Sequence, residues 1–65
     1  MSVGSRIRFY RDAAGMTQRQ LCRRLRMAPS QLSRYENGLT RPGLEVLCRV
    51  ARALDVRIAD LVVGD

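Results

Sequence analysis

Arginine side chains are the most numerous residues in this sequence that could take part in binding chemistry. The chain has twelve basic residues, all of them arginine, against six acidic ones, and its formal net charge is +6. A compact basic domain favours an anionic partner, most often a nucleic acid, although charge alone leaves a solvated basic surface as the alternative. We expect no enzyme and no cofactor, because the sequence has no histidine, no cluster of paired carboxylates and no phosphate-cradling glycine loop.

The two cysteines, Cys22 and Cys48, are the other candidates for chemistry. They lack CxxC spacing and have no histidine to complete a set of ligands, so we predict no metal site. Each falls on the apolar stripe of its expected helix, which favours a role as a small core residue over a disulfide or a redox switch. A disulfide is less favoured still in an intracellular protein.

The stretch from Thr17 to Asn37 has the signals of two short helices joined by a tight corner. Thr17 and Gln20 are spaced as a capping box, and Met16 can act as a hydrophobic staple. Helical spacing then gives the first helix an apolar stripe made of Leu21, Cys22 and Leu25. The corner consists of residues 26–28.

The second helix of this pair begins at Pro29, whose fixed φ suits a first helical position. Its inward residues are Leu32 and Tyr35, and the sequence Asn37-Gly38 ends it, because glycine adopts the left-handed conformation easily. Its outward residues are Ser30, Gln31, Ser33 and Arg34. Two helices that share an apolar face in this way form a helix-turn-helix.

The rest of the chain is predicted to support this pair. We expect a helix over residues 3–14, capped by Ser2, a helix over 44–54 capped by Gly43, and a short helix over 58–63. The first would bury Val3, Ile7, Tyr10 and Ala14, and the second Leu44, Leu47, Cys48, Ala51 and Leu54. The prediction is one all-α domain over residues 1–65, with five helices around a small core.

A chain of this size buries only roughly 60% of its unfolded surface, so dimerisation would help its stability. The sequence has neither an apolar run that could span a membrane nor the apolar segment of a signal peptide. We therefore expect a soluble, intracellular protein.

Several motifs, in this order and spacing, make the chain resemble the Cro/phage-repressor, or XRE-type, helix-turn-helix family. They are RxxAGMTQxxL ending at Leu21, QLSRYENG at 31–38, RP at 41–42, LExLCRVARALDV at 44–56 and ADL at 59–61. The resemblance covers nearly the whole chain. It implies a compact, λ-repressor-like five-helix domain whose third helix enters the major groove of DNA.

The sequence departs from the family pattern at the corner. Arg26 stands where the family usually has a glycine in the left-handed conformation. Either the arginine adopts that conformation at a cost of about 1 kcal/mol, or the turn is built differently. Ala28 stands where a serine or threonine would cap the third helix, at a cost of ~1 kcal/mol that Pro29 partly offsets.

In the groove, side chains near the start of the third helix meet the base edges. Arg34 is the best candidate, because a guanidinium can bond guanine O6 and N7 in a bidentate way. The full set of base-reading candidates is Pro29, Ser30, Gln31, Ser33 and Arg34. For each of them, solvent contact or local capping is the alternative.

A second set is expected to bind phosphates without reading sequence. Gln18 lies at a helix start, where free amides and the helix dipole favour an anion. The resemblance implies phosphate contacts for Thr17, Gln18, Asn37, Thr40 and Arg41. Arg19 and Arg23 either add charge to this set or only solubilise the domain.

The resemblance also implies an ion pair between Arg11 and Glu36, with two unrelated surface charges as the alternative.

Because one helix covers few base pairs, we expect a two-fold homodimer on a near-palindromic operator, with half-sites ~34 Å apart. The candidate dimer contact is Leu61, Val62 and Val63; closure of the core over the fourth helix is its alternative.

The sequence thus predicts a sequence-specific, double-stranded DNA-binding transcriptional regulator, most simply a repressor, encoded by a bacterium or phage and located in the cytoplasm. Two alternatives are an antitoxin-type protein-interaction module and the DNA-binding domain of a longer regulator.

Overall fold

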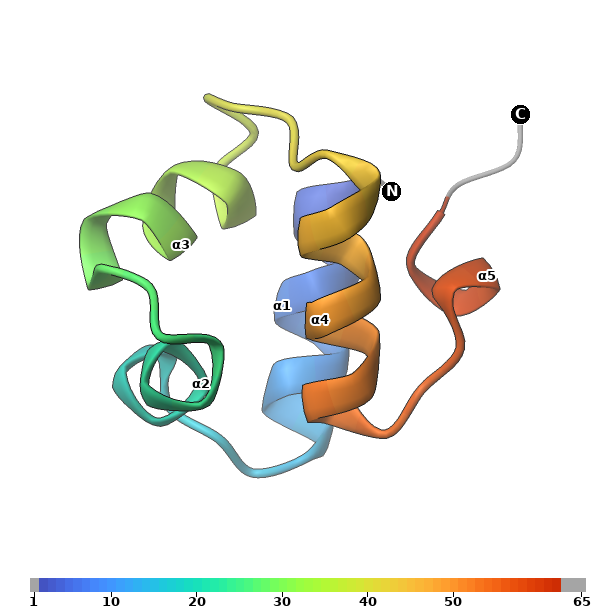
Figure 1. Ribbon diagram of the computed structural model, residues 1–65, viewed down its shortest axis with the longest axis horizontal. Helices are drawn as coiled ribbons and strands as arrows, with labels where there is room; N and C mark the ends of the chain where they lie inside the picture. The colour runs from blue at the N-terminus through green and yellow to red at the C-terminus, as the bar shows by residue number, and fades with distance from the viewer. Residues whose placement is uncertain (1, 63–65) are drawn as a thin grey trace.

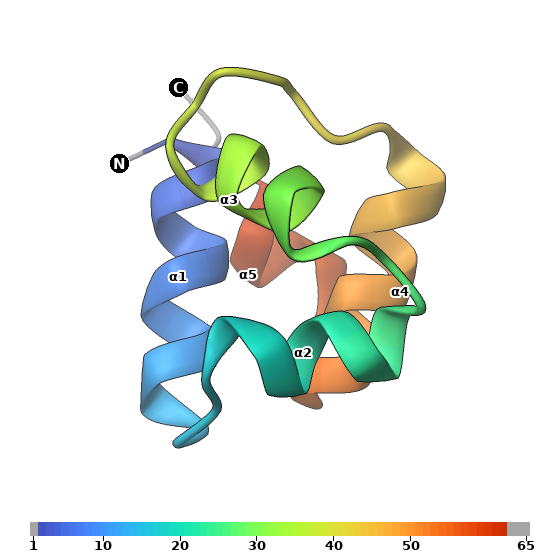
Figure 2. The same cartoon turned by 90° about the vertical axis from the view of Figure 1, so that its left-hand side faces the viewer.

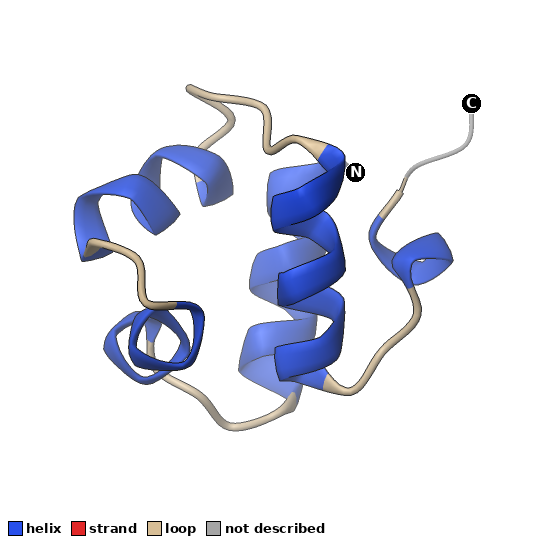
Figure 3. Ribbon diagram, viewed as in Figure 1, coloured by secondary structure: helices blue, strands red, loops and turns tan. Residues whose placement is uncertain are grey.

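A computed structural model describes residues 2–62 of the chain, and over this range every regular element is an α-helix (Figures 1 and 3). The helices are α1 (Val3–Ala13), α2 (Gln18–Leu25), α3 (Pro29–Glu36), α4 (Leu44–Leu54) and α5 (Ile58–Leu61). The predicted all-α, five-helix class is therefore confirmed. Over residues 2–62, no helix combines the length and the apolar character needed to cross a bilayer.

Two helices form the centre of the domain, and the other three pack against them. Helices α1 and α4 lie against each other in the middle of the domain, with α2 and α3 on one side and α5 on the other (Figure 1). Helix α3 packs on α1 and α2, while α2 also packs on α4. In Figure 2 the helix pair α2–α3 faces the viewer, in front of α5. The helix-turn-helix is thus one wall of the domain.

Local capping explains where the helices begin. The Ser2 hydroxyl accepts a hydrogen bond from the Ser5 amide at 3.1 Å, as predicted for α1. At α2, the Thr17 hydroxyl accepts from the Gln20 amide at 3.1 Å, and the Gln20 side chain accepts from the Thr17 amide at 2.8 Å. The predicted capping box is confirmed, and it satisfies two amides that α2 cannot bond internally.

The corner between α2 and α3 has the left-handed residue that the sequence analysis considered at Arg26. Arg26 ends α2 with φ 53° and ψ 50°, in the left-handed region. Ala28 precedes α3 without a side-chain cap, and Pro29 occupies the first turn. Arg26 therefore adopts the left-handed conformation itself, and α3 begins at a proline without a side-chain cap.

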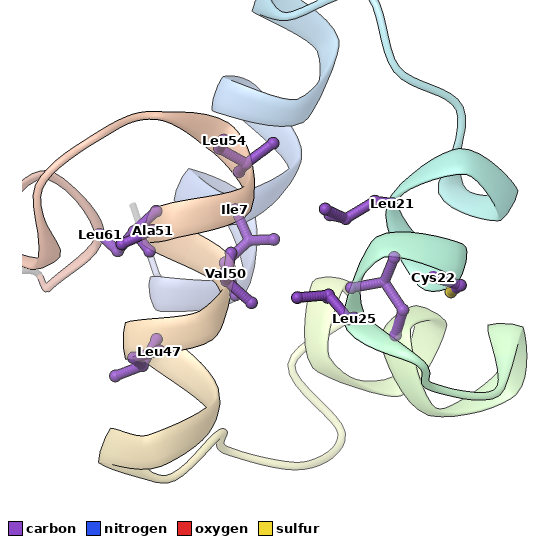
Figure 4. Close-up of a cluster of buried hydrophobic side chains, with 10 residues drawn as sticks. Ile7, Leu21, Cys22, Leu25, Leu47, Val50, Ala51, Leu54 and Leu61 are labelled. Carbon is purple, nitrogen blue, oxygen red and sulfur yellow. The ribbon is translucent and has the colours of Figure 1, made fainter.

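The core gathers side chains from all five helices, and its fully buried members are Ile7, Leu21, Leu25, Leu32, Val50 and Leu61. Figure 4 shows Leu21 and Leu25 pointing from α2 toward Ile7 and Val50. This cluster fixes the helix-turn-helix on the central helices.

Two predictions about the apolar faces and one predicted helix end differ from the structure. Leu44 is 68% exposed, because α4 buries the stripe Leu47, Val50, Ala51 and Leu54, and Leu44 precedes it in the first turn. Ala14 is exposed at the C-cap of α1. Helix α5 ends at Leu61, since Val62 already has an extended backbone, and Val63 lies outside the described residues.

Both cysteines are free thiols. Cys22 is buried in the core, as predicted, and its burial raises the pKa of the thiol. Cys48 is half-buried at the edge of the α4 stripe.

Candidate nucleic-acid interface

The outer side of α3 carries the predicted base-reading residues. Leu32 and Tyr35 are buried and attach the helix to the core. Four of the five candidates are exposed, while Ser33 is only half exposed. The exposed four are Pro29, Ser30, Gln31 and Arg34.

Arg34 is held at one of its three nitrogens. Its Nε donates to the Thr40 hydroxyl at 3.2 Å, across the turn that follows α3. Within residues 2–62 its two terminal nitrogens have no hydrogen-bond partner. The guanidinium therefore keeps the N–H donors of both terminal nitrogens for another partner.

Two other polar side chains on α3 are engaged locally. Gln31 Nε2 donates to the Tyr35 hydroxyl at 3.1 Å. Asn37 Nδ2 donates to the Ser33 hydroxyl at 3.2 Å, one turn back along the helix. Gln31 and Asn37 each keep an amide oxygen and one N–H for another partner.

The predicted phosphate-binding residues lie at both ends of the helix pair. Arg19 and Arg23 are exposed on α2, and Asn37, Thr40 and Arg41 are exposed after α3. Thr17 uses its hydroxyl in the capping box. Gln18 is half-buried, and its Nε2 donates to Glu36 Oε1 at 2.9 Å, a contact that sequence reasoning missed.

A buried ion pair lies behind the helix-turn-helix. Arg11 Nε donates to Glu36 Oε2 at 2.7 Å and Arg11 Nη2 donates to Glu36 Oε1 at 3.1 Å, with the two residues only 7% and 6% exposed. The hydrogen bond with Glu36 raises the pKa of Arg11. Arg11 Nη1 also donates to the Met16 carbonyl at 2.8 Å. Together with Gln18, the pair connects α1, α2 and α3.

Gly4 was not singled out by the sequence, yet it sets the distance between α1 and α3. A Cβ added there would overlap the Tyr35 carbonyl oxygen and lie 3.1 Å from that of Glu36. The signal that could have found it is a glycine inside a helix, which disfavours the helix unless packing needs it.

The predicted dimer contact is wrong for one residue. Leu61 is fully buried, so it closes the core over α4, which was the alternative for this group. Val62 is 40% exposed and remains accessible to a second subunit.

Comparison with known proteins agrees with this geometry. The model of a family described as helix-turn-helix matches residues 7–61. A relative from Sinorhizobium fredii, named as the uncharacterized HTH-type transcriptional regulator y4dL, is 41% identical over 56 residues, covering 86% of this chain and 29% of the relative. The chain spans less than half the length of several of the curated relatives that it matches.

Two solved structures have the same arrangement of helices. The clp gene regulator ClgR from C. glutamicum superposes with a TM-score of 0.87 and 34% identity, over 91% of this chain and 77% of ClgR. SinR, a master regulator for biofilm formation solved in complex with DNA, superposes with a TM-score of 0.85 and 33% identity, over 91% of this chain and 95% of SinR.

Proposed function

The chain belongs to the helix-turn-helix family of the Cro/phage-repressor type, and we propose that it is a sequence-specific, double-stranded DNA-binding transcriptional regulator that acts as a repressor. The observation that carries this proposal is the outer side of α3, which presents exposed polar residues on a scaffold that superposes on DNA-bound SinR. An α-helix of this kind fits the major groove.

In the proposed complex, Arg34 reads guanine. Its Nε remains on Thr40, and the terminal nitrogens donate to guanine O6 and N7. Ser30 and Gln31 lie one turn earlier and meet neighbouring base edges, while the ring of Pro29 meets a thymine methyl group. Ser33 contributes least, because it is half-buried and already bonded to Asn37.

Phosphate contacts hold the helix in register. The Thr40 hydroxyl accepts from Arg34 and therefore keeps its own O–H to donate to a phosphate oxygen. Arg41, Asn37, Arg19 and Arg23 add exposed donors, and the first amides of α2 add the positive end of a helix dipole. The set proposed to bind phosphates is completed by Thr17 and Gln18.

The chain acts on DNA as a two-fold homodimer in this proposal. Two copies place their α3 helices about one DNA turn, ~34 Å, apart on a near-palindromic operator. Val62 is the accessible apolar residue at the C-terminal side of the described fold and is a proposed dimer contact, together with Val63.

In vitro selection of bound duplexes, followed by sequencing, tests the proposal. We expect an inverted repeat, and we expect selected sites to bind at least ~10³-fold more tightly than random duplex at the same salt concentration. A ratio below about ten in a mobility-shift titration would rule out a sequence-specific repressor.

A further inference from the structure

A cleft of about 230 Å³ lies between α2 and α4, on elements that the proposed base-reading surface does not use. Three arginines and two apolar residues line it: Arg24, Leu25, Arg49, Arg52 and Ala53. The two helices pack against each other along this side of the domain (Figure 2). The cleft therefore belongs to the rigid scaffold and not to a loop.

The arginines of the cleft are only partly satisfied by the protein. Arg24 Nη1 donates to the Ala53 carbonyl at 3.4 Å, and Arg49 Nη2 donates to the Leu25 carbonyl. A guanidinium carries five N–H donors, so each of these two keeps most of its donors. The side chain of Arg52 makes no hydrogen bond or ion pair within residues 2–62, and in that range no carboxylate lies within 4.0 Å of any of the three guanidinium groups.

We propose that this arginine cleft binds an acidic segment of a partner protein. Carboxylates of the segment pair with the guanidinium groups of Arg24, Arg49 and Arg52, and an apolar side chain of the same segment covers Ala53. Guanidinium forks are well suited to bidentate carboxylate binding. The volume lies below the range of drug-sized ligand sites, roughly 300–1,000 Å³, and suits a side chain.

Charge and shape favour this occupant over two others. A second copy of the chain carries a net charge of +6 and would be repelled by a basic cleft. A DNA backbone offers phosphates but no projecting apolar side chain to cover the Ala53 side of the cleft. Because α3 remains free, the protein can hold DNA and an acidic partner at the same time.

Fluorescence anisotropy with a labelled peptide of alternating glutamate and leucine tests the proposal on the full chain. We expect this peptide to bind at least about five-fold more tightly than a matched peptide with serine in place of leucine. Arg52→Gln should weaken binding of the leucine peptide about five-fold, because it removes one carboxylate partner without breaking an internal bond.

The matched control is Arg8→Gln, which removes an exposed arginine from α1 and should change binding less than two-fold. Circular dichroism confirms that both variants are folded. Equal binding of the two peptides, or equal effects of the two variants, would overturn the proposal. So would a random-sequence duplex that displaces the peptide and loses affinity with Arg52→Gln, since the cleft would then belong to DNA.

Discussion

Arg34 reaches out from α3 with its Nε already engaged by Thr40, which leaves the terminal nitrogens for a base. We expect Arg34→Ala to weaken binding to selected sites by ~1–3 kcal/mol and to relax the preference at one base position. Affinity titration together with repeated in vitro selection measures both effects. Arg23→Ala is the matched control, because loss of a phosphate contact should weaken all sequences alike. Even losses across sequences for both variants would contradict the assignment of Arg34.

The pair of Arg11 and Glu36 should behave as a unit in unfolding experiments. We expect Arg11→Met or Glu36→Leu alone to cost ~3–5 kcal/mol, since each leaves the other charge buried without a partner. The double variant should be more stable than either single one. Urea denaturation followed by circular dichroism measures all four proteins, and additive losses in the double variant would show that the two charges are not coupled.

At this scale the sequence predicted which residues are exposed better than it predicted which residues touch. Arg34 was placed outside correctly because helical spacing decides orientation. Its bond to Thr40 depends on the path of the turn after α3, and the bond of Gln18 to Glu36 depends on how α2 and α3 pack; helical spacing encodes neither.

The contact of α1 with α3 depends on Gly4 having no side chain. We expect Gly4→Ala to lower the free energy of unfolding by ~2 kcal/mol or more, because a Cβ would overlap the Tyr35 carbonyl and push α3 away. Affinity for selected DNA should fall as well. Thermal unfolding and DNA titration measure these losses.

Gly43→Ser provides the control for Gly4→Ala. A Cβ at Gly43 meets nothing within 4 Å, and serine can cap α4, so this variant should be neutral or slightly stabilising. If both variants leave stability and DNA affinity unchanged, the close approach of α1 and α3 does not depend on the missing side chain of Gly4.

The corner between α2 and α3 stores a small strain at Arg26. We expect Arg26→Gly to stabilise the protein by about 1 kcal/mol, because glycine adopts the left-handed conformation without the penalty of a side chain. The melting temperature should rise by roughly 4–8 °C. A lower melting temperature would mean that the arginine side chain contributes more than its backbone costs.

Most helix bounds could be predicted because caps and turn residues are local. The bounds of α4 were predicted as Leu44–Leu54 and are confirmed, yet its buried face is turned relative to the prediction. Both Leu44 and Val50 fit a helical period, and only the neighbouring helices decide which of them is covered. The spacing of apolar residues predicts that α4 has an apolar stripe, while the packing of the neighbouring helices decides which of those residues are buried.

For the whole molecule, the excess of arginine should make DNA binding strongly dependent on salt. If four to six phosphates are neutralised per subunit, log K should fall with log salt by roughly 0.9 units per contact. Titrations at several salt concentrations give this slope. Arg41→Ala should reduce it by about one unit, whereas Arg52→Gln should leave it unchanged. A slope near zero would exclude a binding mode based on phosphates.

The residues that would contact a second subunit were the hardest feature to predict from the sequence. Leu61 and Val62 are adjacent apolar residues, and only the fold separates the buried one from the exposed one. Nothing local distinguishes a residue that closes a core from one that meets a second subunit.

The carboxylate of Glu36 accepts hydrogen bonds from Arg11 on α1 and from Gln18 on α2. The last residue of α3 is therefore bonded to the first residue of α2. The helix that would touch phosphates and the helix that would touch bases are therefore locked together before any ligand arrives. If α2 and α3 bind DNA as proposed, we expect docking to leave their relative placement unchanged and to lose little ordering entropy. Under the same proposal, we expect the rate of association with DNA to be limited by diffusion and not by ordering of the interface.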